Sequence, residues 1–258
     1  MSSFLSLAYL FFIGSVSGWV LEVFFRKFFS GSNPEHKWIN PGFCTGPYVP
    51  LYGCGLCALY LLGNSASHAG ASGSVAGRII TVVIMAICMT LIEYAAGILL
   101  LKTAKVRLWD YSRRPGNING LICPLFSLFW GLLGAAYYFL LHPHVLGAIS
   151  WLADNLAFSF VIGFFFGVFV IDIAHSLQLT AKLKKFADDN QVIIKYENLK
   201  SHIRSAHDKA SLRYSFIFPF RSSLDIGEHL ANAKDSLESI KTKAINRVKE
   251  NNSHKQDN

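Results

Sequence analysis

The stretch from Ile79 to Leu101, IITVVIMAICMTLIEYAAGILLL, decides the fold class because it contains one charged residue among 23. A bilayer core about 30 Å thick needs roughly 20 apolar residues of α-helix to cross it. The stretch therefore predicts a membrane-spanning helix. Its charged residue, Glu93, is the fifteenth residue, too deep for a short side chain to reach the headgroups easily. We expect Glu93 to have a functional or pairing role, or to hydrogen-bond a neighbouring helix.

The same length criterion identifies further spans on both sides. Residues 48–62 form a shorter apolar run that contains Pro50 and two glycines, so it fits either a distorted span or a re-entrant segment, and we predict a span. The predicted fold is all-α, a polytopic transmembrane helix bundle over residues 1–181. Its five spans are predicted at residues 4–25, 48–62, 79–101, 121–141 and 156–179.

The distribution of Lys and Arg orients these spans. Of the 24 basic residues, 23 fall in the first connecting segment, the third connecting segment and the C-terminal tail. Basic connecting segments stay on the cytoplasmic side. We therefore predict a protein of the cytoplasmic membrane with its N-terminus outside and its C-terminus in the cytoplasm. A four-span alternative without residues 48–62 would place one basic connecting segment outside.

The composition excludes several classes of protein. Hydrophobic residues make up 52% of the chain and charged residues only 16%, which argues against a soluble domain. The net charge of +8 does not predict nucleic-acid binding, because 15 of the 24 basic residues and 10 of the 16 acidic residues lie together after residue 181. No G-x-x-x-x-G-K-[ST] phosphate loop and no hydrolase motif is present, so the sequence gives no strong signal for an enzyme and favours a protein without enzyme activity.

No cofactor and no metal site is predicted. His142 and His144, on either side of Pro143, fall in a predicted outside loop. Two imidazoles without a third ligand make a weak metal site. We therefore expect both histidines to be solvated.

Polar residues gather where the predicted bundle meets the cytoplasm. The segments Trp38–Gly55 and Trp109–Gly120 are rich in Pro, Gly and Asn, so neither forms regular helix throughout. Irregular backbone at membrane depth is tolerated where protein or a water-filled cavity satisfies it. Both segments fall on the predicted cytoplasmic face, so we expect one composite polar cleft. The candidate site residues are Glu22, Asn40, Tyr52, Glu93, Trp109, Asp110, Tyr111, Ser112, Asn117 and Asp172.

Small residues recur at four-residue spacing in two predicted spans. Gly14 and Gly18 form one pair, and Gly163 and Gly167 form the other. Such pairs let helix backbones approach closely, although glycine is also common in membrane helices generally.

The tail, residues 182–258, is predicted to be helical and cytoplasmic. Apolar residues at steps of three and four over residues 226–248 predict a short coiled coil or docking helix, which would bind a cytosolic partner or a second copy of the chain. Basic residues at its start favour anionic membrane lipids. The last residues, 250–258, are polar and are predicted to be disordered.

Several separated motifs resemble one known family, the bacterial putative ABC-transporter type IV membrane proteins, also called the CmpB family. The resemblance covers roughly residues 18–176 and implies a permease-like component that works with a separate ATP-binding subunit. Pro41 departs from the family, which commonly has a basic residue there. The motifs are Gly18-Trp19 with Glu22, the G-F-x-x-G-P-x-x-P-x-Y-G-x-G pattern within Asn40–Gly55, Glu93, Trp109–Ser112, Asn117–Gly120, and Ser127 with Trp130-Gly131.

Three functions remain open from the sequence. The first is a permease-like component of a transporter with a polar, cytoplasm-facing site. The second is a non-transporting scaffold or regulator that recruits a cytosolic partner through its tail. The third is a small membrane enzyme acting on lipid headgroups, with Asp110 and Glu22 as acid and base.

Overall fold

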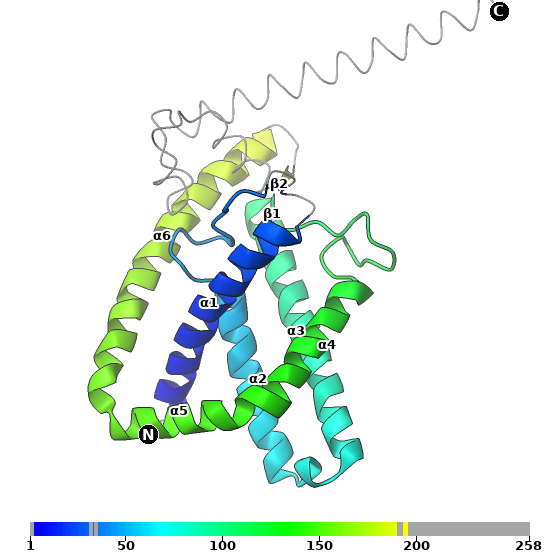
Figure 1. Cartoon of the computed structure of the whole chain (residues 1–258). Helices are drawn as coiled ribbons and strands as arrows, with labels where there is room; N and C mark the ends of the chain where they lie inside the picture. Colours follow the sequence, from blue (N-terminus) through cyan, green and yellow to red (C-terminus); the bar gives the residue numbers. More distant parts are fainter. Residues whose placement is uncertain (1–2, 31–32, 34–35, 190–192, 196–258) are drawn as a thin grey trace, which may run out of the picture. The chain divides into compact units, whose positions relative to one another are not determined.

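The computed structural model describes residues 3–30, 33, 36–189 and 193–195 (Figure 1). The chain divides into two compact units, Met1–Glu197 and Asn198–Asn258. The predicted helix over residues 226–248 and the predicted disorder of residues 250–258 lie outside the described residues.

Six α-helices make up the first unit. They are α1 (Ser3–Phe28), α2 (Pro50–His68), α3 (Val75–Ala104), α4 (Pro124–Ala136), α5 (His142–Asp154) and α6 (Ser159–Asp189). Short helical turns join them, namely η1 (Ala71–Gly73), the π turn η2 (Tyr137–Leu141) and η3 (Leu156–Phe158). Two residue pairs, β1 (Val106–Arg107) and β2 (Ile194–Lys195), run parallel to each other. The predicted all-α helical bundle is confirmed.

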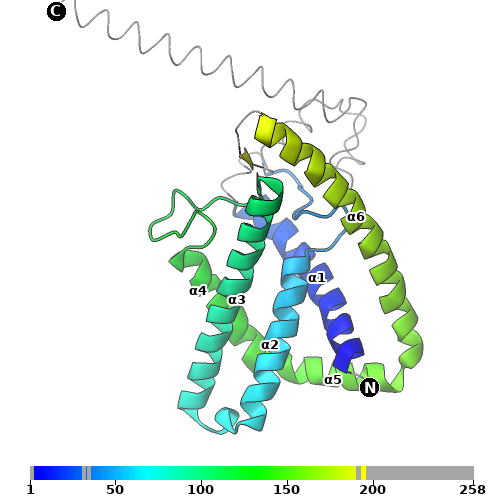
Figure 2. The same ribbon diagram turned by 180° about the vertical axis from the view of Figure 1, so that it is seen from behind.

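Four helical segments are long and apolar enough to cross a membrane: Ser3–Phe28, Val75–Ala104, Pro124–Asp154 and Leu156–Lys185. The predicted count of five is therefore approximate, because α2 is not one of the four. Helix α2 includes several small and polar residues, among them Asn64 and Ser65, that lower its hydropathy. It is nevertheless one uninterrupted helix of 19 residues, about 28 Å long, and it lies alongside α1 and α3 in both views (Figures 1 and 2).

Local sequence signals explain where the helices begin and end. Pro50 and Pro124 occupy the first turns of α2 and α4, where a missing N–H costs nothing. Ser74 caps α3 because its hydroxyl accepts a 3.0 Å hydrogen bond from the backbone N–H of Gly77. Helix α6 continues past the expected boundary at residue 181 and ends at Asp189.

The glycines of α1 bring it against α2. A Cβ added at Gly18 would lie 2.2 Å from the Cβ of Tyr52, and one at Gly14 would lie 2.9 Å from the Cβ of Leu56. The close approach therefore requires glycine at both positions. Gly163 and Gly167 on α6 differ, since a Cβ at either would meet nothing within 4 Å. Of the two predicted pairs, only the α1 pair therefore lies at a close helix contact with described residues.

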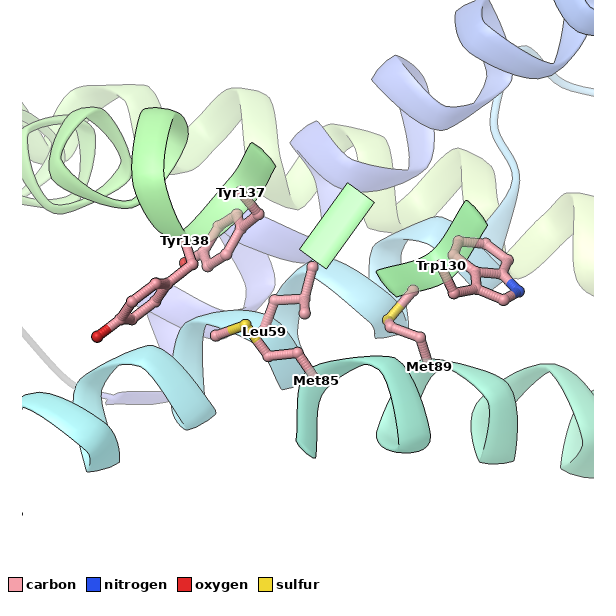
Figure 3. Packing of buried hydrophobic residues seen from close by; sticks show 6 residues of the cluster. All are labelled: Leu59, Met85, Met89, Trp130, Tyr137 and Tyr138. Atoms are coloured by element: carbon pink, nitrogen blue, oxygen red, sulfur yellow. The ribbon is translucent and has the colours of Figure 1, made fainter. Parts of the chain in front are cut away.

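A buried cluster lies between α2, α3, α4 and η2, and Figure 3 shows its six members: Leu59, Met85, Met89, Trp130, Tyr137 and Tyr138. The outward faces are apolar as well. On α3, Ile79, Ile87, Leu91 and Leu99 are each more than half exposed. Exposed apolar side chains along whole helices fit contact with lipid rather than water.

The structure corrects the prediction for residues 142–155. They form helix α5 instead of a loop, and α5 lies across one end of the bundle (Figures 1 and 2). His142 is buried, not solvated, and its Nδ1 lies 3.0 Å from the Tyr137 hydroxyl. The helical backbone continues through the π turn, so His142 remains packed in the bundle when the chain changes direction.

Candidate functional site

Both irregular segments lie at the same end of the bundle. Figure 1 shows the connection between α1 and α2 and that between β1 and α4 at the end where α1 finishes. Arg26, Lys27 and Arg107 belong to this end, which we call the basic end. The opposite end is formed by the turn between α2 and α3 and by α5. The two segments are therefore close enough to contribute to one site.

Glu93 is the most buried carboxylate of this site. Four other residues of α3, at four-residue spacing, share its buried face: Thr81, Met85, Met89 and Gly97. The Glu93 side chain is 3% exposed and accepts hydrogen bonds from the Tyr111 hydroxyl (3.1 Å) and from Trp130 Nε1 (2.9 Å). Both donors are neutral. Among the described residues no cation forms an ion pair with Glu93.

Glu22 on α1 is the second carboxylate. Arg26 Nε donates to it at 2.9 Å and the Tyr52 hydroxyl donates at 2.8 Å. Glu22 interacts electrostatically with Glu93, and the Tyr52 ring lies 5.5 Å from the Trp130 ring between their centroids. The two carboxylates and their partners therefore form one group. We call Glu22, Arg26, Tyr52, Glu93, Tyr111 and Trp130 the two-carboxylate cluster.

Tyr111 joins this cluster to the connection between β1 and α4. Its backbone N–H donates to the Gly120 carbonyl at 2.8 Å, and its ring stacks on Phe126 with 4.3 Å between centroids. Burial of the phenol raises the pKa of Tyr111 well above its ordinary value, and the charge of Glu93 raises it further. Tyr111 therefore remains a hydrogen-bond donor at physiological pH.

Asp110 organises the same connection. Its carboxylate accepts from the backbone N–H and the hydroxyl of Ser112, and from Arg107 Nη1 at 3.0 Å. Asn117 donates to the Arg114 carbonyl at 2.8 Å and accepts from the Gly120 N–H at 3.0 Å. Asp110, Ser112 and Asn117 thus fold the segment that presents Tyr111.

Trp109 fixes this segment against α3. Its Nε1 donates to the Leu121 carbonyl at 2.8 Å. The helix surface below it is a glycine, Gly97, where an added Cβ would lie 3.3 Å from the Trp109 ring and 3.0 Å from Leu121. Asn119 donates to the Tyr94 hydroxyl at 3.0 Å, which adds a second link to α3.

Asp172 on α6 fixes the other irregular segment. Its carboxylate accepts from the backbone N–H groups of Thr45 (3.1 Å) and Gly46 (2.8 Å). The hydroxyls of Thr45 and Tyr48 also donate to it, and that of Ser176 does so at 3.3 Å. We call this arrangement the Asp172 anchor. It ties the segment before α2 to α6.

Asn40 links the same segment to α1. Its Oδ1 accepts from Trp19 Nε1 at 2.6 Å, and its Nδ2 donates to the Thr45 carbonyl at 2.8 Å. Asn40 is 3% exposed, so its amide is fully used inside the protein. Its position supports the segment rather than the two-carboxylate cluster.

The expected composite site is thus divided. Glu22, Tyr52, Glu93 and Tyr111 come together in the two-carboxylate cluster. The remaining predicted site residues hold the two irregular segments: Asn40 and Asp172 hold the first, and Trp109, Asp110, Ser112 and Asn117 hold the second.

Sequence reasoning missed several partners. Trp130 was not predicted as a site residue, although an indole N–H within an uncharged membrane helix must find an acceptor. Arg26 was not predicted as a site residue either, and it forms an ion pair with Glu22. The donors Thr45 and Tyr48 to Asp172 lie more than 120 residues away in the chain, so no local pattern could identify them.

The chain was compared with models of known protein families. The model of the family described as "Putative ABC-transporter type IV" matches residues 9–177. That range runs from α1 through most of α6 and includes all six residues of the two-carboxylate cluster. No curated protein and no solved structure matched the chain.

Proposed function

Because the chain belongs to the membrane-protein family of putative ABC-transporter type IV proteins, we propose that it is a permease-like transporter component. In this proposal the two-carboxylate cluster is the polar site that contacts the solute. The observation that carries it is the geometry of Glu93. A carboxylate that is 97% buried on a membrane-spanning helix is held by an indole and a phenol from two other elements.

The hydrogen bonds of Glu93 suit exchange with a ligand. Its two donors are neutral side chains, which can rotate away, and none is a fixed backbone N–H. Ionisable residues inside membrane bundles are costly, and they commonly mark pathways for ions or solutes. With Glu22 and Glu93 ionised, the cluster carries two negative charges against the one positive charge of Arg26. It therefore favours a solute that is cationic or rich in hydrogen-bond donors.

The basic end is the proposed cytoplasmic face, where an ATP-binding subunit would dock. Arg113 and Arg114 are exposed there, in the connection that presents Tyr111 to Glu93. A subunit bound to this connection would act on Glu93 through the side chain of Tyr111. Purification in mild detergent should therefore recover an ATP-binding protein with the wild-type chain and lose it when both arginines become Glu. Recovery of the subunit with the double variant would contradict this docking site.

Replacement of Glu93 by Gln tests the site itself. Gln keeps the size and one acceptor oxygen but removes the charge. Cells that produce the Glu93→Gln protein should show the same altered set of intracellular solutes, by mass spectrometry, as cells without the protein. Asp154→Asn is the matched control, because Asp154 is an exposed carboxylate at the end of α5. Both variants are compared at equal membrane abundance.

The scaffold function predicts the reverse pattern. In that case Glu93→Gln would resemble the wild type, whereas deletion of residues 182–258 would abolish function. The solute comparison therefore separates the two functions in one experiment. The lipid-headgroup enzyme has less structural support, since the Asp110 carboxylate already binds Arg107 and Ser112 in the fold of its own segment.

A further inference from the structure

A second polar group lies at the opposite end of the bundle. The His142 side chain is 7% exposed, and its Nδ1 lies 3.0 Å from the Tyr137 hydroxyl. Its other ring nitrogen, Nε2, is buried and has no hydrogen-bond partner among the described residues. In either neutral tautomer this leaves one N–H or one lone pair unused. Buried polar atoms are nearly always satisfied, so an unused one calls for an explanation.

The backbone around His142 is shaped to hold this ring. Residues Tyr137–Leu141 form a π turn, a feature that is rare and frequent at functional sites. Gly63 of α2 faces the ring, and a Cβ added there would lie 2.8 Å from His142 Cε1. The Tyr138 ring stacks on the His142 ring with 6.4 Å between centroids. Three elements therefore enclose one imidazole.

An apolar barrier separates this imidazole from Glu93. Met85 and Met89 precede Glu93 by about two turns and one turn of α3 on the same buried face, so Met85 and Glu93 are about 12 Å apart along the helix. Leu59 of α2 packs against both methionines (Figure 3). Trp130 and Tyr137 lie at different ends of this cluster. Trp130 bonds to Glu93 and Tyr137 to His142.

We propose that the Tyr137–His142 pair is a proton-binding site of the permease, separated from the two-carboxylate cluster by the barrier of Leu59, Met85 and Met89. The inference rests on the proposed function and makes the transported species a proton, alone or with a solute. The lone pair of Nε2 takes up a proton from water, while the Nδ1–H donates to the Tyr137 oxygen. The proton then passes, through water that enters the barrier, to a carboxylate oxygen of Glu93, and Glu93 releases it to water at the basic end, so that both groups return to their starting states. No electrons are transferred.

Few ionisable groups surround either proton site. Tyr137 and Tyr138 face His142, and Tyr137 also interacts with Tyr60 and Cys57 of α2. On the other side of the barrier, Glu93 faces Tyr111, Trp130 and Glu22. A dry apolar barrier between two polar sites prevents proton leakage at rest, because hydrophobic constrictions exclude water.

The test uses the full chain reconstituted in liposomes, with a potassium gradient and valinomycin to drive protons and a pH-sensitive dye to report them. Met89→Ser should admit water into the barrier and raise the proton flux several-fold over the wild type. The matched control, Met89→Leu, keeps the barrier apolar and should leave the flux at the wild-type rate. A Met89→Ser protein that is no faster than the wild type would overturn the proposal.

The second part of the test places His142→Phe in the Met89→Ser background. The flux should return to the wild-type rate, and Tyr137→Phe in the same background should lower it partly without altering the fold. A leak that persists with His142→Phe but disappears with Glu93→Gln overturns this inference alone. A leak that disappears with His142→Phe but persists with Glu93→Gln keeps His142 as a proton-binding site, but overturns the transfer to Glu93 and with it the proposed function of the two-carboxylate cluster. Size-exclusion profiles confirm that each variant is folded.

Discussion

Asp172 and Glu93 are both carboxylates buried within membrane-spanning helices, at 7% and 3% exposure, but different partners hold them. Asp172 accepts five hydrogen bonds, two of them from backbone N–H groups. Glu93 accepts two, both from side chains. The two carboxylates are therefore similar in burial and differ in the type and number of their donors.

The difference has a physical basis. Backbone donors cannot leave Asp172 unless residues 45–46 move, so the charge is bound permanently and fixes the segment before α2. The donors to Glu93 move by side-chain rotation, so a ligand can replace them at little cost to the fold. We therefore expect the first arrangement to stabilise the bundle and the second to allow a ligand to replace the donors.

Replacement of Asp172 by Ala should have the largest effect on stability. It leaves two backbone N–H groups and the Tyr48 hydroxyl buried without an acceptor. The expected loss is about 3 kcal/mol or more in the free energy of unfolding. Thermal unfolding in detergent measures it, with Asp154→Asn as the control. An unchanged unfolding temperature would show that the Asp172 anchor is not structural.

The α1–α2 seam should be the next most sensitive feature. At Gly18 an added Cβ would overlap Tyr52, whereas at Gly163 it would meet nothing within 4 Å. Gly18→Ala should therefore lower the free energy of unfolding by about 2 kcal/mol. Gly163→Ala, measured in the same thermal assay, should not lower it. Equal losses at the two positions would contradict the described packing.

A smaller effect is expected when Glu93 loses one of its two donors. Tyr111→Phe removes the hydroxyl that bonds to Glu93 and should lower the free energy of unfolding by about 1 kcal/mol. The variant should also show part of the altered solute set of cells without the protein, and not all of it, because Trp130 still holds Glu93. Tyr94→Phe is the control, since Tyr94 bonds Asn119 on the exposed side of the same segment. If Tyr94→Phe gave the full altered solute set and Tyr111→Phe gave none of it, the role assigned to Tyr111 would be contradicted.

The main helices were predictable because hydropathy and length act locally. The predicted spans at residues 4–25 and 79–101 lie within α1 and α3. The predicted span at residues 121–141 covers α4 and the π turn, but α5 was not predicted. Pro143 and the two histidines indicated a loop, whereas proline fits the first turn of a helix equally well. The crossing of α2 was ambiguous because its apolar run is short and contains Pro50, Gly53 and Gly55, although an added Cβ at Gly53 would meet α1 and one at Gly55 would meet Met89 of α3.

The site was only partly predictable. Glu93 could be selected because an isolated carboxylate deep in an apolar run has no local partner. Its partners, Tyr111 and Trp130, depend on how α3, α4 and their connection pack. The spacing of apolar residues in the sequence does not reveal that packing. The donors to Asp172 could not be predicted for the same reason, because Thr45, Gly46 and Tyr48 are distant from it in the sequence.

The most direct test compares Glu93→Gln with Asp172→Asn in one preparation, measuring thermal unfolding in detergent together with the solute phenotype in cells. We predict that Asp172→Asn loses both stability and function. Glu93→Gln should unfold at a temperature only slightly below that of the wild type, and it should lose function. If Glu93→Gln unfolds as early as Asp172→Asn, or functions as the wild type does, then Glu93 is a second structural carboxylate and the account is wrong.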